Sequence, residues 1–139
     1  MSPMDRNGLE ILEPAECLRL FATATVGRLA YTSGGIPAVI PVNVALAEQV
    51  LFRLGTGAAL AAIYDHQLVA LEVDAIDLDA CCGWSVNVVG NPTEVPAALA
   101  GAVGHLVRSW LRPDTTRLFS LQTTHVTGRR LLPGPGAAS

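Results

Sequence analysis

The stretch that decides the fold is residues 26–57, VGRLAYTSGGIPAVIPVNVALAEQVLFRLGTG, and it predicts short β-strands joined by tight turns. Its first part, residues 26–32, is rich in apolar, β-branched and aromatic residues, which favour a strand. That strand stops at Ser33-Gly34-Gly35, where glycine adopts left-handed backbone at little cost. We therefore expect a hairpin turn here, followed by a second strand over residues 36–46.

The second strand carries two prolines, Pro37 and Pro41. Because proline lacks the N–H that a sheet ladder needs, these positions favour an edge strand or a bulge over the centre of a sheet. A third strand is predicted over residues 49–54. It runs into Gly55-Thr56-Gly57 and then into a short apolar helix over residues 58–64.

Two more helices and a last strand are expected outside this stretch. Proline suits the first helical position, and acidic residues favour that end of the helix dipole, so a helix should begin at Pro14 and end near residue 24. A further helix is expected over residues 96–111, a last strand over residues 117–126 and a flexible tail over residues 132–139. The apolar stripe that predicts this further helix consists of Leu99, Val103, Val107 and Trp110.

Length, hydrophobic content and net charge restrict the class of protein to which this chain can belong. A length of 139 residues suits a single domain over residues 1–139, and a hydrophobic content of 50% predicts that a homo-oligomer hides part of the surface. The net charge of −3 and the scattered arginines argue against a nucleic-acid partner. No apolar run approaches the roughly 20 residues that span a bilayer, and no export signal begins the chain, so the cytoplasm is expected.

Three motifs follow the opening stretch at regular intervals. They are residues 69–74 (VALEVD), 83–90 (GWSVNVVG) and 126–131 (VTGRRL). In order and spacing, these motifs and residues 26–57 together resemble the pyridoxamine 5′-phosphate oxidase-like flavoproteins, above all the small actinobacterial members grouped with nitroimidazole-resistance proteins. The resemblance covers about residues 8–131. It implies a mainly β fold with a few helices, a split β-barrel that forms a homodimer and binds flavin mononucleotide (FMN) at the dimer interface.

The resemblance also implies which residues hold the cofactor. Backbone amides that lead into a helix can bind an anion, and an arginine fork suits a phosphate. The residues expected at the phosphate are Arg28, Arg53, Gly55, Thr56 and Gly57. The residues expected at or beside the flavin ring are Pro41, Val42, Asn43, Trp84 and Ser85. The implied activity is an FMN-dependent oxidoreductase that acts on a small molecule, whose identity the resemblance leaves open.

Three positions depart from the family's pattern. Ala58 and Ala59 stand where the phosphate loop normally has a serine or threonine and then a lysine, and Val44 stands where an aromatic residue is usual. No lysine compensates, because all nine basic residues are arginine. An alternative function is therefore a split-barrel dimer with a degenerate flavin phosphate site, which either is non-catalytic or binds haem, a deazaflavin, a small metabolite or no cofactor.

Several of these residues also have a purely structural interpretation. Trp84 suits a core position, Asn43 suits an edge strand, and Arg53 suits the outward face of a strand whose alternate residues point to the core. The adjacent Cys81 and Cys82 lack partners at zinc-site spacing and are interpreted as loop thiols in a reducing compartment. No metal site is predicted.

Overall fold

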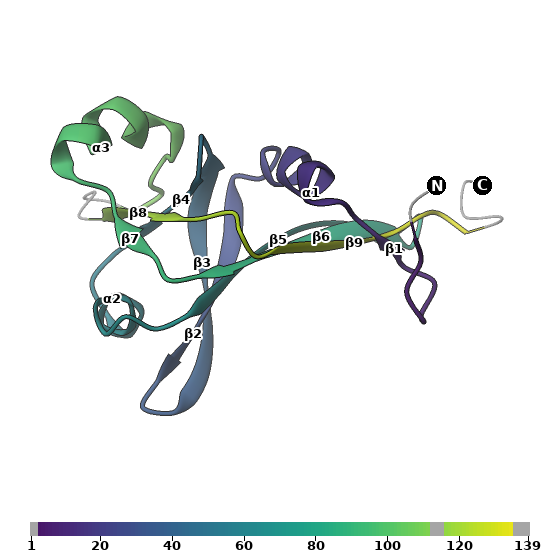
Figure 1. Ribbon diagram of the computed structural model, residues 1–139, viewed down its shortest axis with the longest axis horizontal. Coiled ribbons are helices and arrows are strands. Elements are labelled where there is room, and N and C mark those ends of the chain that lie inside the picture. Colours follow the sequence, from purple (N-terminus) through teal and green to yellow (C-terminus); the bar gives the residue numbers. More distant parts are fainter. Residues whose placement is uncertain (1–2, 112–115, 135–139) are drawn as a thin grey trace.

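A computed structural model of the chain describes residues 3–111 and 116–134, and within them the chain is mainly β (Figure 1). The strands are β1 (Glu10–Ile11), β2 (Val26–Ser33), β3 (Ile36–Leu46), β4 (Val50–Leu54), β5 (Val69–Asp77), β6 (Cys82–Gly90), β7 (Thr93–Glu94), β8 (Arg117–Leu121) and β9 (Val126–Leu131). The helices are α1 (Pro14–Phe21), α2 (Ala58–Tyr64) and α3 (Ala97–Val103), and the short 3₁₀ helix η1 (Gly104–Leu106) follows α3. The predicted mainly β class is confirmed.

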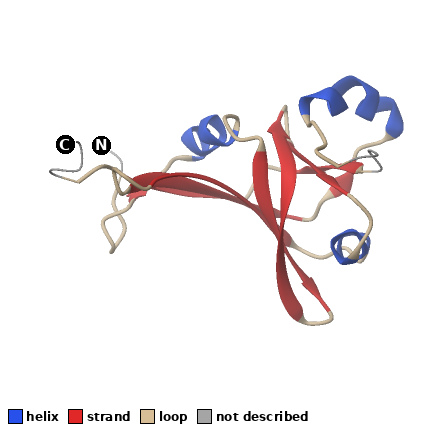
Figure 2. Ribbon diagram, turned by 180° about the vertical axis from the view of Figure 1, so that it is seen from behind, coloured by secondary structure: helices blue, strands red, loops and turns tan. Residues whose placement is uncertain are grey.

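The described strands form one antiparallel sheet in the order β1-β9-β6-β5-β2-β3-β4-β8-β7. Strand β3 is long enough to serve two parts of this sheet, since residues 36–43 pair with β2 and residues 44–46 pair with β4. The sheet therefore turns at β3. Figure 2 shows the strands running in two different directions, with α2 and α3 beside one part and α1 beside the other.

The side chains buried most deeply come from both parts of the sheet and from α1. Phe52 on β4 and Phe119 on β8 are paired across the ladder, and their stacked rings lie 5.7 Å apart. Phe21 at the end of α1 and Leu71 on β5 are fully buried in the same cluster. Burying large apolar side chains of this kind is worth about 1.5–3 kcal/mol each, so the core holds the curled sheet in shape.

The strands predicted from residues 26–57 are confirmed, with ends that differ by a residue at most. Gly34 and Gly35 form the hairpin turn with positive φ angles of 57° and 77°. Strand β3 is interior in the sheet order, but residues 36–43 pair with β2 alone and β4 joins only at residues 44–46. Pro37 and Pro41 therefore lie at a local edge of the sheet, as predicted, where a missing N–H donor costs no second pairing.

The helix expected over residues 96–111 was wrong in length. Helix α3 ends at Val103, and only the 3₁₀ turn of η1 continues it. Leu99 and Trp110, expected on the apolar stripe of this helix, are 59% and 70% exposed. Glycines disfavour a helix interior, and the carbonyl of Gly104 is occupied by hydrogen bonds from Arg53 and from the amide of Val107. For these reasons the α-helix ends at Val103 and does not reach residue 111.

The single strand expected over residues 117–126 was also wrong. Residues 117–121 form β8, residues 126–131 form β9, and a turn separates them. The two strands have different partners, because β8 pairs with β4 and β7, whereas β9 pairs with β6 and β1. Most of the predicted tail, residues 135–139, lies outside the described residues. Among the described residues, no helix is both long and apolar enough to cross a membrane.

Candidate functional site

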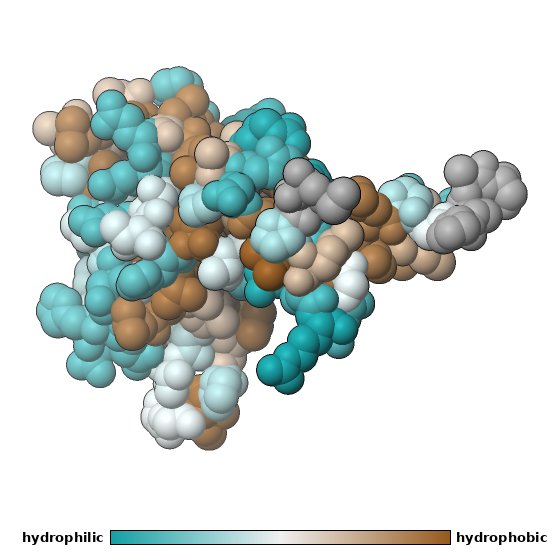
Figure 3. All heavy atoms as spheres, turned by 45° about the vertical axis from the view of Figure 1, so that its right-hand side comes forward, coloured by the Kyte–Doolittle hydropathy of each residue, from teal (hydrophilic) through white to brown (hydrophobic). Residues whose placement is uncertain are grey.

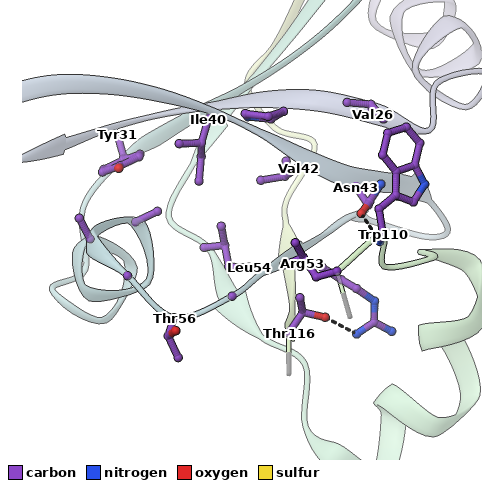
Figure 4. A pocket seen from close by; sticks show the side chains of 16 residues that line it. Val26, Tyr31, Ile40, Val42, Asn43, Arg53, Leu54, Thr56, Trp110 and Thr116 are labelled. Carbon is purple, nitrogen blue, oxygen red and sulfur yellow. Dashed lines mark hydrogen bonds between the residues drawn. The ribbon is translucent and has the colours of Figure 1, made fainter. Parts of the chain in front are cut away.

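A cavity of about 460 Å³ opens between β2, β3, β4 and the loop that enters α2 (Figure 4). The residues that line it are Val26, Tyr31, Ile40, Pro41, Val42, Asn43, Arg53, Leu54, Gly55, Thr56, Gly57, Ala58, Ala59, Trp110, Leu111 and Thr116. Most of the wall is apolar, and the polar groups are few and separated. Such a composition is typical of sites for organic cofactors and small molecules.

The cavity brings together most of the residues that the sequence predicted for the cofactor. The ring residues Pro41, Val42 and Asn43 line it from β3, and Arg53 and residues 55–57 line it from β4 and the following loop. In Figure 4, Val42 and Asn43 lie on the strand above the cavity, Thr56 lies on the loop at its lower left, and Arg53 lies below Asn43 and Trp110. Their roles at a cofactor stay predictions, but their common location is a property of the fold.

Arg28 does not line this cavity. Its guanidinium forms ion pairs with Asp74, at 3.2 Å, and with Glu72, at 3.6 Å, on the neighbouring strand β5. Burial raises the pKa of Glu72 to about 7, and the nearby Asp74 carboxylate adds to the rise. One carboxylate oxygen of Glu72 is buried without a hydrogen-bond partner. The positive charge of Arg28 is thus committed to two carboxylates of its own sheet.

Trp84 and Ser85 lie at a second cavity, of about 310 Å³, near the turn between β5 and β6. Cys81 and Cys82 line the same cavity, as does Arg129. Within one chain, these residues do not meet the cavity that holds Asn43. Among residues 3–111 and 116–134, no group of three or more His, Cys, Asp or Glu side chains could hold a metal ion.

Arg53 is only partly exposed, and its guanidinium hydrogen-bonds the chain itself. Nε donates to the carbonyl of Val107 at 2.7 Å, and Nη2 donates to the carbonyl of Gly104 at 2.9 Å. Nη1 lies 3.5 Å from the hydroxyl of Thr116. In Figure 4 the guanidinium points toward Thr116 and away from Thr56. Its predicted contact with a phosphate stays a prediction. In this conformation the guanidinium donates hydrogen bonds to backbone carbonyls of residues 104–107.

The loop before α2 offers mainly neutral groups to a ligand. Thr56 and Ala58 are exposed, whereas Ala59 is 6% exposed and belongs to the core cluster. The ring side of the cavity, with its apolar walls and the Asn43 amide, fits a flat heteroaromatic ring. The loop side fits a phosphate less well, because its side-chain donor is the Thr56 hydroxyl and no described cation there is uncommitted.

Trp110 is a residue of this cavity that the sequence interpretation missed, because it was expected on the apolar stripe of a helix. It lines the cavity, and its backbone N–H donates to Oδ1 of Asn43 at 3.1 Å. Gly101 and Gly104 were the available signal. Two glycines in the preceding helix make an early helix end plausible, and an exposed tryptophan beyond that end is free to face a ligand.

Comparisons with known proteins agree with this fold. The family described as pyridoxamine 5′-phosphate oxidase matches residues 13–130. The chain belongs to this family. It is 29% identical over 139 residues to the uncharacterised protein Rv0080 of Mycobacterium tuberculosis, with 94% of this chain and 91% of the relative covered.

Solved structures show the same architecture. A FAD binding protein from Mycobacterium smegmatis is 25% identical, with a TM-score of 0.66 over 89% of this chain and 99% of that chain. Two more distant structures share the fold alone. A Bacteroides thetaiotaomicron protein that has been proposed to confer 5-nitroimidazole antibiotic resistance is 12% identical, with a TM-score of 0.69 over 88% of this chain and 89% of that chain. The FAD and haem binding protein of M. smegmatis is 14% identical, with a TM-score of 0.67 over 84% and 70%. The predicted family and the predicted split-barrel fold are confirmed.

Proposed function

We propose that this protein is a flavin-dependent oxidoreductase that binds FMN, or the larger flavin FAD, in the cavity beside Asn43 and Trp110. The observation that carries the proposal is the convergence of Pro41, Val42 and Asn43 with the glycine loop on one largely apolar cavity. A relative with 25% identity is a FAD binding protein, which supports a flavin here. A bound flavin supplies the redox chemistry, and the protein supplies binding, orientation and electrostatics.

Each part of the cavity has a distinct task in this proposal. Apolar side chains such as Val42 and Leu54 exclude water from a flat ring, and the Asn43 amide reaches its hydrogen-bonding edge. The exposed indole of Trp110 lies beside Asn43, where it can stack on a ring. The substrate is a small molecule that approaches the open side of the ring.

The proposal includes a homodimer, which we expect in the cytoplasm. Large hydrophobic residues remain 62–84% exposed on several strands and turns, among them Ile36, Val39, Leu68, Ile76 and Leu78. Figure 3 shows hydrophobic atoms at the surface, including along the part of the sheet that projects from the rest. Exposed apolar surface of this kind favours association. A second copy also brings the Trp84 and Ser85 of another chain within the assembly, which is how those residues could reach a shared cofactor.

The direct test is the absorption spectrum of freshly purified protein. Flavin bands near about 370 and 450 nm, which bleach on anaerobic reduction and return on reoxidation, are expected. Colourless protein is next titrated with FMN, FAD and riboflavin. The flavin proposal is wrong if none of the three binds.

A second candidate is a split-barrel protein that binds haem, a deazaflavin or another small metabolite without the family's usual phosphate contacts. The observation that favours it is the loop side of the cavity, where Ala58 and Ala59 stand and Arg53 donates to backbone carbonyls. Haem produces an intense Soret band, and a deazaflavin lacks the flavin band near about 450 nm, so the same spectrum separates the candidates.

A further inference from the structure

Residues 104–111, which we name the strap, run along one side of the cavity. Trp110 and Leu111 line the cavity from the strap, and both side chains are more than half exposed, at 70% and 55%. The strap is not part of the regular sheet. Its position therefore depends on individual side-chain contacts, and the strongest of these come from residues that the sequence analysis predicted at the cofactor.

Arg53 holds the beginning of the strap. The Nε and Nη2 atoms of one planar guanidinium donate to two different carbonyls, those of Val107 at 2.7 Å and Gly104 at 2.9 Å. A lysine ammonium is a compact charge without this planar fork and does not reproduce both bonds in the same geometry. The fit is tight, because a Cβ on Gly104 would lie 3.0 Å from Nη2.

Asn43 holds the end of the strap. Its Oδ1 accepts the N–H of Trp110 at 3.1 Å. On the far side of the cavity, Leu111 reaches the glycine loop, since a Cβ on Gly55 would lie 3.5 Å from its Cδ1 atom. Before these contacts in the chain, the buried Val107 packs with Leu51 and Leu118. The strap thus connects the β3 side of the cavity to the loop side.

We propose that Arg53 and Asn43 are positioning residues. They hold the strap so that Trp110 and Leu111 border the cavity, and in this way they determine which ligand the cavity accepts. Arg53 then affects ligand affinity through the strap and not through a phosphate. This inference rests on the proposed flavin site for the identity of the ligand, whereas the holding of the strap is a property of the ligand-free chain.

The first experiment measures amide hydrogen exchange of the ligand-free protein. The variants are Arg53→Lys, Gly104→Ala and Asn43→Ala, and the matched control is Arg19→Lys, an exposed arginine of α1 that pairs with Glu16. Amide exchange in residues 104–111 should become about tenfold faster or more in Arg53→Lys and Gly104→Ala. A hydrogen bond to a charged group contributes enough free energy to change the equilibrium constant for local opening by about that factor. Asn43→Ala should accelerate exchange near Trp110. Residues 69–90 should be unchanged throughout.

The second experiment titrates the same variants with FMN and with riboflavin, which lacks the phosphate. A positioning role predicts that Arg53→Lys and Gly104→Ala weaken both ligands by a similar factor, about fivefold or more, so that their affinity ratio stays within about twofold of the wild type. Gly104→Ala is informative because it alters the strap and leaves the Arg53 charge in place.

The outcomes separate the two levels of the proposal. Unchanged exchange in residues 104–111 for both Arg53→Lys and Gly104→Ala overturns the positioning role, whatever the ligand. Loss of FMN affinity alone on Arg53 substitution, with Gly104→Ala unaffected, also overturns it and identifies Arg53 as a phosphate ligand. If the wild type binds neither flavin, the proposed function fails, and faster exchange in the variants still supports the positioning role.

Discussion

The backbone N–H of Trp110 donates a 3.1 Å hydrogen bond to Oδ1 of Asn43, and this bond joins two residues that are 67 positions apart in the sequence. Asn43 belongs to the strand whose sequence indicated the family, whereas Trp110 follows a helix that ends earlier than its periodicity suggested. Their contact places an exposed indole at the mouth of the candidate cofactor cavity.

Replacing Trp110 by alanine should weaken flavin binding. An aromatic pair contributes about 0.5–1.5 kcal/mol beyond area burial, so the affinity is expected to fall about two- to twelvefold. Trp110→Phe keeps an aromatic face and should retain most of the affinity. Flavin fluorescence titration measures both variants, and equal affinities for Trp110→Ala and wild type would show that the indole does not contact the ring.

Restoring the family's phosphate-loop side chains should tighten FMN binding. Ala58→Ser combined with Ala59→Lys adds a hydroxyl and a cation, and charge-assisted hydrogen bonds contribute about 1–3 kcal/mol. Riboflavin serves as the control ligand, because it has no phosphate to benefit. Ala59 is buried, so a thermal melt must first establish that the double variant is folded. An FMN affinity that does not change would place the phosphate away from this loop.

The pKa of Glu72, raised to about 7, predicts a pH dependence of stability. A carboxyl whose pKa is higher in the folded state than its usual 4.5 binds more protons when folded, so its contribution is complete below about pH 4.5 and is lost as the pH rises through about 7. Wild type should therefore lose stability relative to Glu72→Gln between pH 4.5 and 8. Thermal melts across this range measure the difference.

Glu16 provides the opposite behaviour and is the matched control for Glu72. Hydrogen bonds from Arg19 and Arg130 lower the pKa of Glu16 to about 2, so its contribution is present above pH 4.5 and is lost as the pH falls toward 2. Relative to Glu16→Gln, wild type should lose stability only on the acid side. A difference for Glu72→Gln that is constant from pH 4.5 to 8 would contradict the raised pKa.

Light scattering at micromolar concentration should give twice the 14.5 kDa mass of the chain. Stable dimers of this kind bury about 2,000 Å² or more, and the exposed apolar side chains on the strands supply suitable surface. Circular dichroism on the same sample confirms that the protein is folded. A folded chain with a monomeric mass rules out the homodimer, and with it any cofactor site that needs Trp84 from a second copy.

Much of the sheet could be predicted because local chemistry specifies it. The Gly34-Gly35 turn, the apolar run of β4 and the short apolar helix α2 each depend on neighbours in the sequence. The ring residues of the cavity were also anticipated, through the family resemblance. The division between β8 and β9 was missed because their partners, β4 and β6, lie far away in the chain. Local periodicity carries no information about such partners.

By itself, the sequence determined the family, the mainly β class and the glycine loop with its alanines at positions 58 and 59. These follow from residue types at fixed spacing. Only the tertiary structure decided that Arg28 pairs with Asp74, that Trp84 lies at a different cavity within the chain, and that Arg53 donates to the carbonyls of Gly104 and Val107. A guanidinium takes whichever acceptors the fold brings within about 3 Å, and those acceptors come from segments distant in sequence.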